Sequence, residues 1–158
     1  MGVFTGKSLG FPPCTAEACL RLLDFYGIGL EGKRVTVIGR SLVVGRPLAM
    51  MMMERGATVT ICHRQTRDLA AVTREAEVIV TAAGALGLLT GEMVRPGQVV
   101  VDVAMNRNAR GEMVGDARFE EVEKVVGAIT PVPGGVGTVT TSVLMRLVVV
   151  AGERGDDR

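Results

Sequence analysis

The chain has 158 residues, a length typical of one domain with a sizeable core. Its net charge is +1 without a basic block, so the charge favours neither a nucleic-acid partner nor an anionic membrane. Aromatic residues make up 3% of the chain and Trp is absent, which disfavours recognition of stacked bases. Apolar residues make up 47%, and Val, Leu, Ala and Met dominate them, as in a buried parallel sheet that helices cover.

Cysteines and apolar runs indicate the compartment. Cys14, Cys19 and Cys62 are odd in number and lack the spacing of a metal site, so we interpret them as reduced thiols and expect no metal. The sequence shows no signal peptide at its start and no apolar run of membrane-spanning length. These features predict a cytoplasmic protein without a membrane partner.

The first half of the chain alternates helices and strands. Residues 1–13 are rich in Gly and Pro with little periodicity, which predicts an extended lead-in. Thr15 is expected to cap a helix that continues to Tyr26 and carries apolar side chains on more than one side. The elements expected next are a strand over 34–38, a helix over 47–55 and a strand over 58–62.

The second half continues this alternation. Asp68 and Asp116 are each expected to cap a short helix, over 69–75 and 118–124. A small hairpin is expected between Asn106 and Val114. The other elements expected are strands over 78–81, 99–103 and 127–130, a Gly/Pro-rich loop over 131–137, and a last helix over 140–151. The domain then covers residues 14–151, and residues 152–158 are predicted to be a disordered tail.

Strand–helix alternation of this kind predicts an α/β fold: a Rossmann-like, doubly wound parallel sheet in three α/β/α layers. Ligands of such sheets bind outside the carboxyl ends of the strands. The loops that follow the predicted strands are 39–41, 63–65, 82–84, 104–106 and 131–137. Because these loops hold most of the Gly-rich and polar segments, the topology favours a dinucleotide site at that edge.

The turn after the first strand has the pattern Gly39-x-Ser41-x-x-x-Gly45, followed by Pro47. Pro suits a first helical position, and the N–H groups and positive dipole end of the helix favour an anion such as phosphate. The spacing differs from the dinucleotide pattern G-x-G-x-x-G. The stretch alone therefore fits an ordinary strand–helix turn equally well.

The end of the second strand indicates which cofactor is bound. NAD-binding domains usually place a carboxylate there, whereas this sequence has His63, Arg64 and Thr66, with Arg40 expected nearby. A guanidinium matches phosphate geometry, so the residues favour NADP over NAD. Alternatively, Arg64 and Arg67 are solvated surface charges. His63 is the only histidine, and we interpret it as a spacer or a donor to phosphate rather than a catalytic base.

Several motifs together resemble the methylenetetrahydrofolate dehydrogenase/cyclohydrolase family, and specifically its C-terminal NAD(P)-binding domain. The motifs stand in the family's order over residues 6–151. They are Pro13-Cys14-Thr15, Gly39-Arg40-Ser41, Val44-Gly45-Arg46-Pro47, His63-Arg64-Gln65-Thr66, Asp102-Val103 with Asn106, Gly115-Asp116 and Thr130-Pro131-Val132-Pro133-Gly134-Gly135-Val136-Gly137. The last run is the most specific of them.

The resemblance implies roles for particular residues. Arg40, Ser41 and Arg64 match positions that hold the ribose phosphate and pyrophosphate of NADP, while Val103, Met105 and Thr140 match positions near the nicotinamide. The expected cofactor-binding set is Gly39, Arg40, Ser41, Val44, Gly45, His63, Arg64, Thr66, Ala83, Gly84, Val103, Met105 and Thr140. Pro133, Gly134 and Gly135 match a loop between cofactor and folate. The family transfers hydride from methylenetetrahydrofolate to the nicotinamide and then hydrolyses the methenyl product to formyltetrahydrofolate.

The sequence also departs from the family. Its members carry a preceding catalytic domain with a Tyr-x-x-x-Lys motif, and no such pair occurs among Tyr26, Lys7, Lys33 and Lys124. We therefore identify no catalytic residue and expect the chain alone to be inactive, needing a catalytic partner for turnover. Smaller departures from the family's usual Gly, Pro and Asn are Ala104, Thr138 and Leu147.

The missing half predicts an interaction surface. In the family the first and last helices of this domain bridge to the catalytic domain. Six apolar residues would lose that cover: Leu20, Leu23, Tyr26, Leu144, Leu147 and Val148. Such patches usually mark interfaces, so we expect self-association or a separate catalytic-domain chain. The resemblance implies a homodimer formed near the second strand. Alternatively, the two helices cover each other.

Three functions remain open at this point. The chain is the NADP-binding part of a folate dehydrogenase/cyclohydrolase, a non-catalytic NADP-binding module, or a small Rossmann dehydrogenase with another substrate.

Overall fold

A computed structural model describes residues 2–5 and 10–156. Its centre is a five-stranded, all-parallel sheet with the strand order β2-β1-β3-β4-β7. The strands are β1 (Arg34–Ile38), β2 (Thr58–Cys62), β3 (Val78–Thr81), β4 (Val99–Asp102) and β7 (Ala128–Ile129). The chain moves outward from β1 to β2 and then returns to β3 on the other side of β1. This order confirms the doubly wound fold and places its switch point between β1 and β3.

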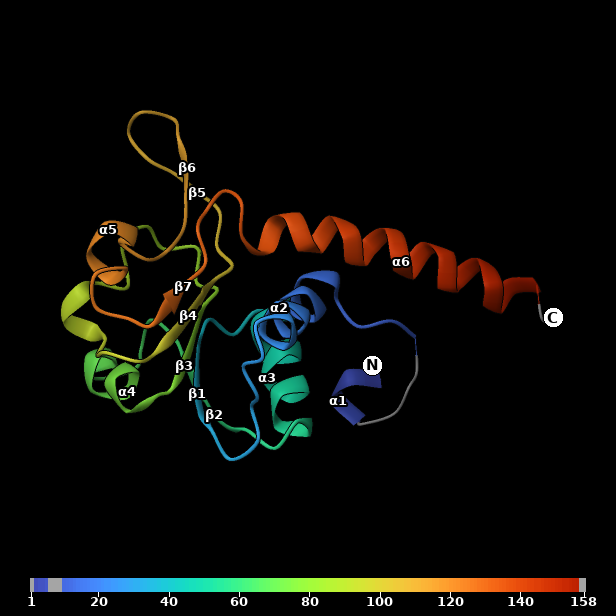
Figure 1. The fold of residues 1–158 in the computed structure, drawn as a ribbon, viewed down its shortest axis with the longest axis horizontal. Helices are drawn as coiled ribbons and strands as arrows, with labels where there is room; N and C mark the ends of the chain where they lie inside the picture. The colour runs from blue at the N-terminus through green and yellow to red at the C-terminus, as the bar shows by residue number, and fades with distance from the viewer. Residues whose placement is uncertain (1, 6–9, 157–158) are drawn as a thin grey trace.

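Helices cover both faces of the sheet (Figure 1). One face carries α2 (Cys14–Phe25), α3 (Gly45–Glu54) and α6 (Val136–Asp156), and the other carries α4 (Leu69–Glu75), the 3₁₀ turn η1 (Gly91–Met93) and α5 (Phe119–Val122). A small antiparallel hairpin of β5 (Asn106–Arg107) and β6 (Met113–Val114) projects beyond the sheet, as the sequence predicted. The three-layer arrangement is confirmed.

Alternation along the strands divides the core into two parts. Val78 and Val80 of β3 pack with α2, α3 and α6, whereas Ile79 packs with residues of α5 and the η1 region. The inner strands β1, β3 and β4 are almost continuously buried because helices lie on both faces, which is why they consist of β-branched runs, whereas the edge strand β2 is largely exposed. The predicted bounds of β1, β2 and β3 match the structure, and those of β4 and β7 differ by one or two residues.

Helix starts were predicted less accurately than strands. Asp68 does cap α4, since its carboxylate accepts a hydrogen bond from the Ala71 N–H at 3.0 Å. Thr15 does not cap α2, because the helix already begins at Cys14 and Pro13 is its N-cap. Pro47 is the third residue of α3 rather than the first. It still costs no hydrogen bond there, because the first N–H groups of a helix have no intrahelical partner.

The ends of the chain differ from the prediction. Gly2–Thr5 forms α1, one helical turn against α3, where an extended lead-in was expected; residues 6–9 lie outside the described part. The last helix begins at Val136 rather than Thr140, because the Thr138 hydroxyl donates to the Gly135 carbonyl and closes the first turn. It continues through Asp156, so the predicted disordered tail is wrong for residues 152–156.

Helix α6 is unusually exposed for an apolar helix. Val143 and Leu147 are buried against the domain, and Arg146 forms a 3.2 Å ion pair with Glu17 of α2. A stretch of α6, Val136–Glu153, is long and apolar enough to cross a bilayer by length and composition, with a mean hydropathy of 1.4. The expectation that no apolar stretch is long enough to cross a membrane was therefore wrong. The mean hydropathy of this stretch is high even though Thr and Arg residues interrupt its apolar residues. One such helix is weak evidence for a membrane, and its packing on α2 fits a domain helix.

Candidate functional site

The glycine turn is a point of very close backbone packing. Gly39 follows β1 with φ +130°, a conformation that favours glycine, and a Cβ there would lie 2.2 Å from the Ala82 carbonyl oxygen. A Cβ on Gly45, at the start of α3, would lie 2.1 Å from the Gly39 carbonyl oxygen. Two glycines therefore let the ends of β1 and β3 and the start of α3 meet at the switch point. Ligands of doubly wound sheets bind at this crevice.

A hollow of about 630 Å³ opens above this turn. Seven of the predicted cofactor residues line it: Gly39, Arg40, Ser41, His63, Arg64, Thr66 and Ala83. The rest of its wall consists of Ile38, Leu69, Ala82, Ala85 and Leu88. A largely apolar wall with a few convergent polar groups is typical of a small-molecule site.

The start of α3 is already satisfied internally. The Ser41 hydroxyl accepts hydrogen bonds from the N–H groups of Val44 at 3.1 Å and Gly45 at 3.4 Å, and the Ser41 carbonyl accepts from Arg46 at 3.0 Å. The predicted anion site of free helix N–H groups therefore needs correction, because Ser41 occupies three of them. Since this hydroxyl accepts twice, its own proton is left to be donated to a ligand. Val44 and Gly45 shape the turn but do not line the hollow.

The loop after β2 is held by its own hydrogen bonds. The His63 N–H donates to the Thr66 hydroxyl at 2.9 Å, and the Thr66 N–H donates to the His63 carbonyl at 2.7 Å. The Gln65 N–H donates to Nδ1 of His63 at 3.2 Å, so a neutral ring carries its proton on Nε2. This geometry agrees with His63 as a donor. Burial raises the pKa of the neighbouring Cys62 thiol, which keeps it neutral.

Arg40 and Arg64 supply the positive charge of the hollow. Within the described part of the chain, neither guanidinium forms an ion pair, although five ion pairs occur elsewhere. Arg67 does not line the hollow. The alternative interpretation, a solvated surface charge, therefore applies to Arg67. Two unpaired guanidinium groups over a cradle that a Cβ would fill suit a phosphorylated ligand.

A second hollow of about 370 Å³ lies at the same edge of the sheet. It collects the remaining predicted residues of the nicotinamide and folate side: Val103, Met105, Pro133, Gly134, Gly135 and Thr140. Thr15, Ala104 and Met113 also line it. The Thr140 hydroxyl donates to the Val136 carbonyl at 3.0 Å within α6. Gly84 lines neither hollow. Contact of these residues with a cofactor stays a prediction.

A pair of buried acids behind the hollows escaped the sequence interpretation. Asp116 was expected to cap α5, but Arg118 is the N-cap and the Asp116 carboxylate instead accepts hydrogen bonds from the loop after β3. The carboxylate of Asp102, at the end of β4, accepts hydrogen bonds from the N–H groups of residues 116 and 117. Burial raises the pKa of Asp102, while these N–H groups lower it and the nearby Asp116 raises it further. The Gly115-Asp116 motif was the available signal.

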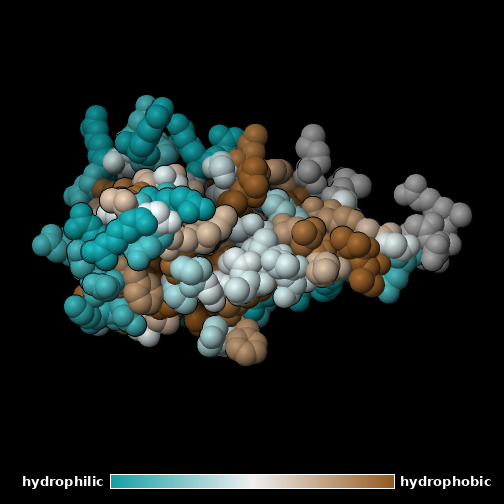
Figure 2. Space-filling view, turned by 90° about the horizontal axis from the view of Figure 1, so that it is seen from above, coloured by the Kyte–Doolittle hydropathy of each residue, from teal (hydrophilic) through white to brown (hydrophobic). Residues whose placement is uncertain are grey.

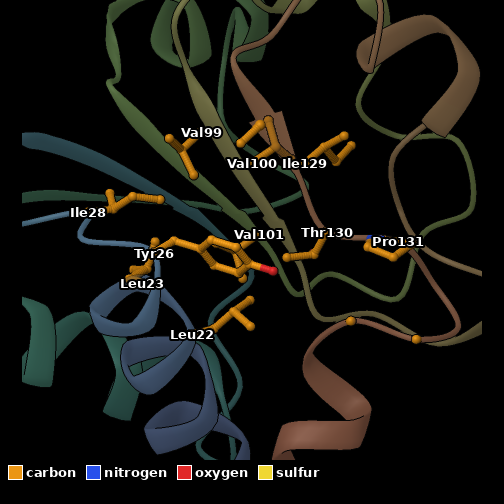
Figure 3. A pocket seen from close by; sticks show the side chains of 13 residues that line it. Leu22, Leu23, Tyr26, Ile28, Val99, Val100, Val101, Ile129, Thr130 and Pro131 are labelled. Atoms are coloured by element: carbon orange, nitrogen blue, oxygen red, sulfur yellow. The ribbon is translucent and has the colours of Figure 1, made fainter.

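The molecule also has an apolar groove beside α2, which meets the second hollow at Pro131, Gly134 and Gly135 (Figure 3). It has a volume of about 470 Å³ between the end of α2 and the strands β4 and β7. Figure 3 shows the Tyr26 ring reaching across it toward Thr130. Its other side chains are Leu22, Leu23, Ile28, Val99, Val100, Val101, Ala128, Ile129 and Pro131. We call this surface the α2 groove.

The fold and the edge hollow define a class: a doubly wound α/β domain with a cradle suited to a dinucleotide. The sequence profile of the tetrahydrofolate dehydrogenase/cyclohydrolase NAD(P)-binding domain matches residues 13–155. The chain belongs to this family, which confirms the resemblance.

Relatives and solved structures agree with this assignment. A bifunctional protein FolD from a Polaromonas species is 52% identical over 145 residues, covering 92% of this chain and 52% of the relative. FolD methylenetetrahydrofolate dehydrogenase/cyclohydrolase from Campylobacter jejuni superimposes with a TM-score of 0.94 at 46% identity, covering 97% of this chain and 54% of that one. The Trypanosoma brucei enzyme, solved with NADP and an inhibitor, gives a TM-score of 0.91 at 36% identity, with coverages of 99% and 55%. The chain spans about half the length of these proteins.

Proposed function

We propose that this chain binds NADP at the carboxyl edge of its sheet and serves as the cofactor-binding part of a methylenetetrahydrofolate dehydrogenase/cyclohydrolase. The observation that carries the proposal is the 630 Å³ hollow, which two unpaired arginines line and into which the end of β2 brings no carboxylate. The Trypanosoma brucei relative, whose structure contains NADP, supports the choice of cofactor.

Different residues of the first hollow bind different phosphates of the cofactor. Arg40 and Arg64 hold the phosphate on the adenosine ribose, because a guanidinium presents several donors to one phosphate. The Ser41 hydroxyl donates a hydrogen bond to the pyrophosphate, and the His63 ring donates another from its Nε2–H. The preference for NADP over NAD then rests on the two arginines.

The second hollow takes the nicotinamide. Val103 and Met105 provide an apolar wall for a flat ring, and the loop containing Pro133 and Gly134 separates that ring from the folate. When bound, NADP⁺ supplies an acceptor for the hydride of methylenetetrahydrofolate. The contribution of this chain is to orient the ring and to shield it from water.

Turnover requires groups from a second unit. Neither hollow has a lysine among its described lining residues: Lys33 precedes β1 at the opposite edge and Lys124 follows α5, while Lys7 lies outside the described part. Hydrolysis of the methenyl product needs a positioned proton-transfer group. The chain alone therefore binds cofactor without oxidising folate.

The apolar surface of α2 and α6 is where the second unit binds. Of the six residues expected to lack cover, Leu20, Leu23 and Leu147 are buried between helices, whereas Tyr26, Leu144 and Val148 are 67%, 51% and 61% exposed. Figure 2 shows hydrophobic side chains gathered over the α6 half of the molecule. The helices thus cover each other only in part. The α2 groove and the outer face of α6 together suit an apolar protein surface.

A homodimer forms separately, along β2. This strand is an edge of the sheet, and its Ile61 side chain is 41% exposed. An edge strand presents unpaired backbone groups to a second copy. The chain functions in the cytoplasm, a proposal that its three free cysteines support.

Calorimetry with NADP and NAD tests the cofactor. We expect tighter binding of NADP, and a loss of about tenfold or more in NADP affinity in Arg64→Ala, with NAD affinity unchanged, because charged hydrogen bonds contribute ~1.5–3 kcal/mol. Arg67→Ala removes a charge from the same loop without touching the hollow and is the matched control. Equal affinity for NADP and NAD would contradict the phosphate assignment.

A coupled assay tests the reaction. Oxidation of methylenetetrahydrofolate should be absent with this chain alone and appear when a family catalytic domain bearing Tyr-x-x-x-Lys is added. NADP binding without turnover in either condition would indicate a non-catalytic NADP-binding module. Reduction of NADP by this chain with an unrelated alcohol or acid would instead identify another small dehydrogenase.

A further inference from the structure

The buried acids Asp102 and Asp116 connect the two hollows. Both carboxylates are almost inaccessible, with exposed fractions of 3% and 0%. Buried carboxylates are costly unless several donors satisfy them. The donors in this case come from three separate loops at the cofactor edge, so the position of each loop depends on the same pair of side chains.

Asp116 accepts four hydrogen bonds. Its Oδ2 accepts from the N–H groups of Ala83 at 2.8 Å and Gly84 at 3.1 Å. Its Oδ1 accepts from the Ala85 N–H at 2.6 Å and from the Asn106 side-chain amide at 2.9 Å. A carboxylate offers about four acceptor positions, so the side chain is fully used.

Asp102 holds the segment that carries Asp116. Its Oδ1 accepts from the N–H of residue 116 at 3.2 Å, and its Oδ2 accepts from the Ala117 N–H at 2.8 Å. A Cβ on Gly115 would lie 2.1 Å from Oδ2 of Asp102, so this segment can lie against the carboxylate only because residue 115 has no side chain. Oδ1 of Asp102 also accepts a hydrogen bond from the Ala104 N–H at 3.1 Å, which fixes the loop after β4.

The bonded loops belong to different hollows. Ala83 and Ala85 line the first hollow, and Ala104 and Met105, directly before Asn106, line the second. Asn106 closes the connection, because its amide also donates to the Gly115 carbonyl at 3.1 Å. One carboxylate therefore bonds at the same time to the loop that borders the adenosine side and to the loop that borders the nicotinamide side.

We propose that Asp116 is a positioning residue that sets the two hollows at the spacing one dinucleotide requires. This role rests on the proposed function. It explains why a fully buried acid accepts three consecutive N–H groups of a ligand-lining loop instead of capping the helix that follows it. A ligand that occupies both hollows depends on the spacing, whereas a ligand that occupies one does not.

The test compares two ligands by calorimetry in three variants of the chain. NADP spans both hollows, whereas adenosine 2′,5′-bisphosphate carries only the adenosine part with its 2′-phosphate and one 5′-phosphate, and lacks the nicotinamide part. Asp116→Asn keeps the shape of the side chain but turns an NH₂ group toward backbone donors. Its ratio of NADP affinity to bisphosphate affinity should fall about tenfold relative to the unmodified chain. Glu123→Gln, the same change at an exposed acid on the neighbouring segment, should leave the ratio unchanged.

Asn106→Ala gives a second, milder route if Asp116→Asn does not fold. It removes one bond to Asp116 and one to the Gly115 carbonyl while the three backbone bonds of Asp116 stay, so the ratio should fall in the same direction by a smaller factor. An equal loss for both ligands, or an unchanged ratio in both variants, would show a merely structural role and overturn the proposal. If neither NADP nor the bisphosphate bound measurably to the unmodified chain, the proposed function itself would fail, and this inference with it.

Discussion

The carboxyl-edge hollow and the α2 groove are both open regions of one small domain, but different side chains line them. The hollow brings together two guanidinium groups, two hydroxyls and an imidazole over a backbone cradle. The groove has mainly leucine, valine and isoleucine side chains with one tyrosine, and none of its described lining residues is charged. The hollow is therefore suited to a small anionic ligand, and the groove to an apolar protein surface.

The two regions also differ in how rigidly they are built. Backbone contacts through Gly39 and Gly45 and the bonds of Asp116 surround the hollow. The groove is bordered by the end of α2, where Phe25 and Tyr26 meet edge to face with ring centroids 5.2 Å apart, and both side chains are exposed. We infer that the cofactor site is preformed, whereas the groove borders a surface that needs a second unit to bury it.

The largest expected effect is at the cradle. Gly45→Ala places a Cβ 2.1 Å from the Gly39 carbonyl oxygen, and neither backbone segment can move without disrupting β1 or α3. We expect the free energy of unfolding to fall by about 3 kcal/mol in urea titrations followed by circular dichroism. Gly29→Ala is the control, because no atom of the described residues lies within 4 Å of the added Cβ and the φ of Gly29 is not left-handed. A Gly45→Ala chain as stable as that control would show that the turn is not closely packed.

The next effect concerns the groove side. Leu144→Glu combined with Val148→Glu places two charges on the exposed face of α6 without touching the core. Binding of a separate family catalytic domain to this face should weaken by about tenfold or more in sedimentation experiments, since each apolar side chain buried at an interface contributes ~1.5–3 kcal/mol. Met53→Glu, on an exposed part of α3, should have no effect.

Ile61→Lys separates the two proposed interfaces. It should lower the mass of the chain alone by weakening the dimer along β2, and leave binding of the catalytic domain intact. The double α6 variant should do the reverse. A strictly monomeric mass of the unmodified chain at high concentration would contradict the dimer along β2.

The strands could be predicted because each is a short β-branched run ended by a glycine turn or a polar loop, a signal contained in neighbouring residues. Arg40 and Arg64 could be predicted to converge, because both follow strands that the topology places side by side. Helix starts were harder. Asp116 has the sequence pattern of a cap, yet its carboxylate bonds to Ala83, Gly84 and Ala85, more than 30 residues away. The local sequence preferences of a residue cannot predict a hydrogen bond over such a separation.

The same reason applies to the terminal helices. That α6 buries Leu147 but leaves Leu144 exposed depends on the angle at which it crosses α2, and periodicity along one helix does not determine that angle. The groove was likewise absent from the sequence interpretation, because its walls come from residues 22–28, 99–101 and 128–135, which meet only in the folded chain.

A smaller effect should appear in the pH dependence of stability at the cofactor edge. Burial raises the pKa of Asp102 from 3.8, so the folded state favours the protonated acid more than the unfolded state does. The stability that Asp102 contributes is then fully present below pH 3.8 and is lost as the pH rises through its folded pKa. The free energy of unfolding of the unmodified chain relative to Asp102→Asn should therefore decline from pH 4 upward.

Urea titrations at several pH values measure this difference. Glu123→Gln, at an exposed acid, should give a pH profile parallel to that of the unmodified chain. A difference between the unmodified chain and Asp102→Asn that grows with pH would mean that the bonds from residues 116 and 117 outweigh burial.

The smallest effect tests whether α2 is closed on its inner side while the groove beside it is open. Cys19 lies on the buried face of α2, and burial raises the pKa of its thiol to about 12, so it is neutral at pH 8. Cys62 is buried as well, and Cys14 at the start of α2 is partly accessible. Because the thiolate is the reactive form, a disulfide reagent at pH 8 should modify at most one cysteine quickly in the native chain and all three in guanidinium. Rapid modification of Cys19 would show that α2 opens together with the groove, and the proposed distinction between a rigid inner face and an exposed outer one would be lost.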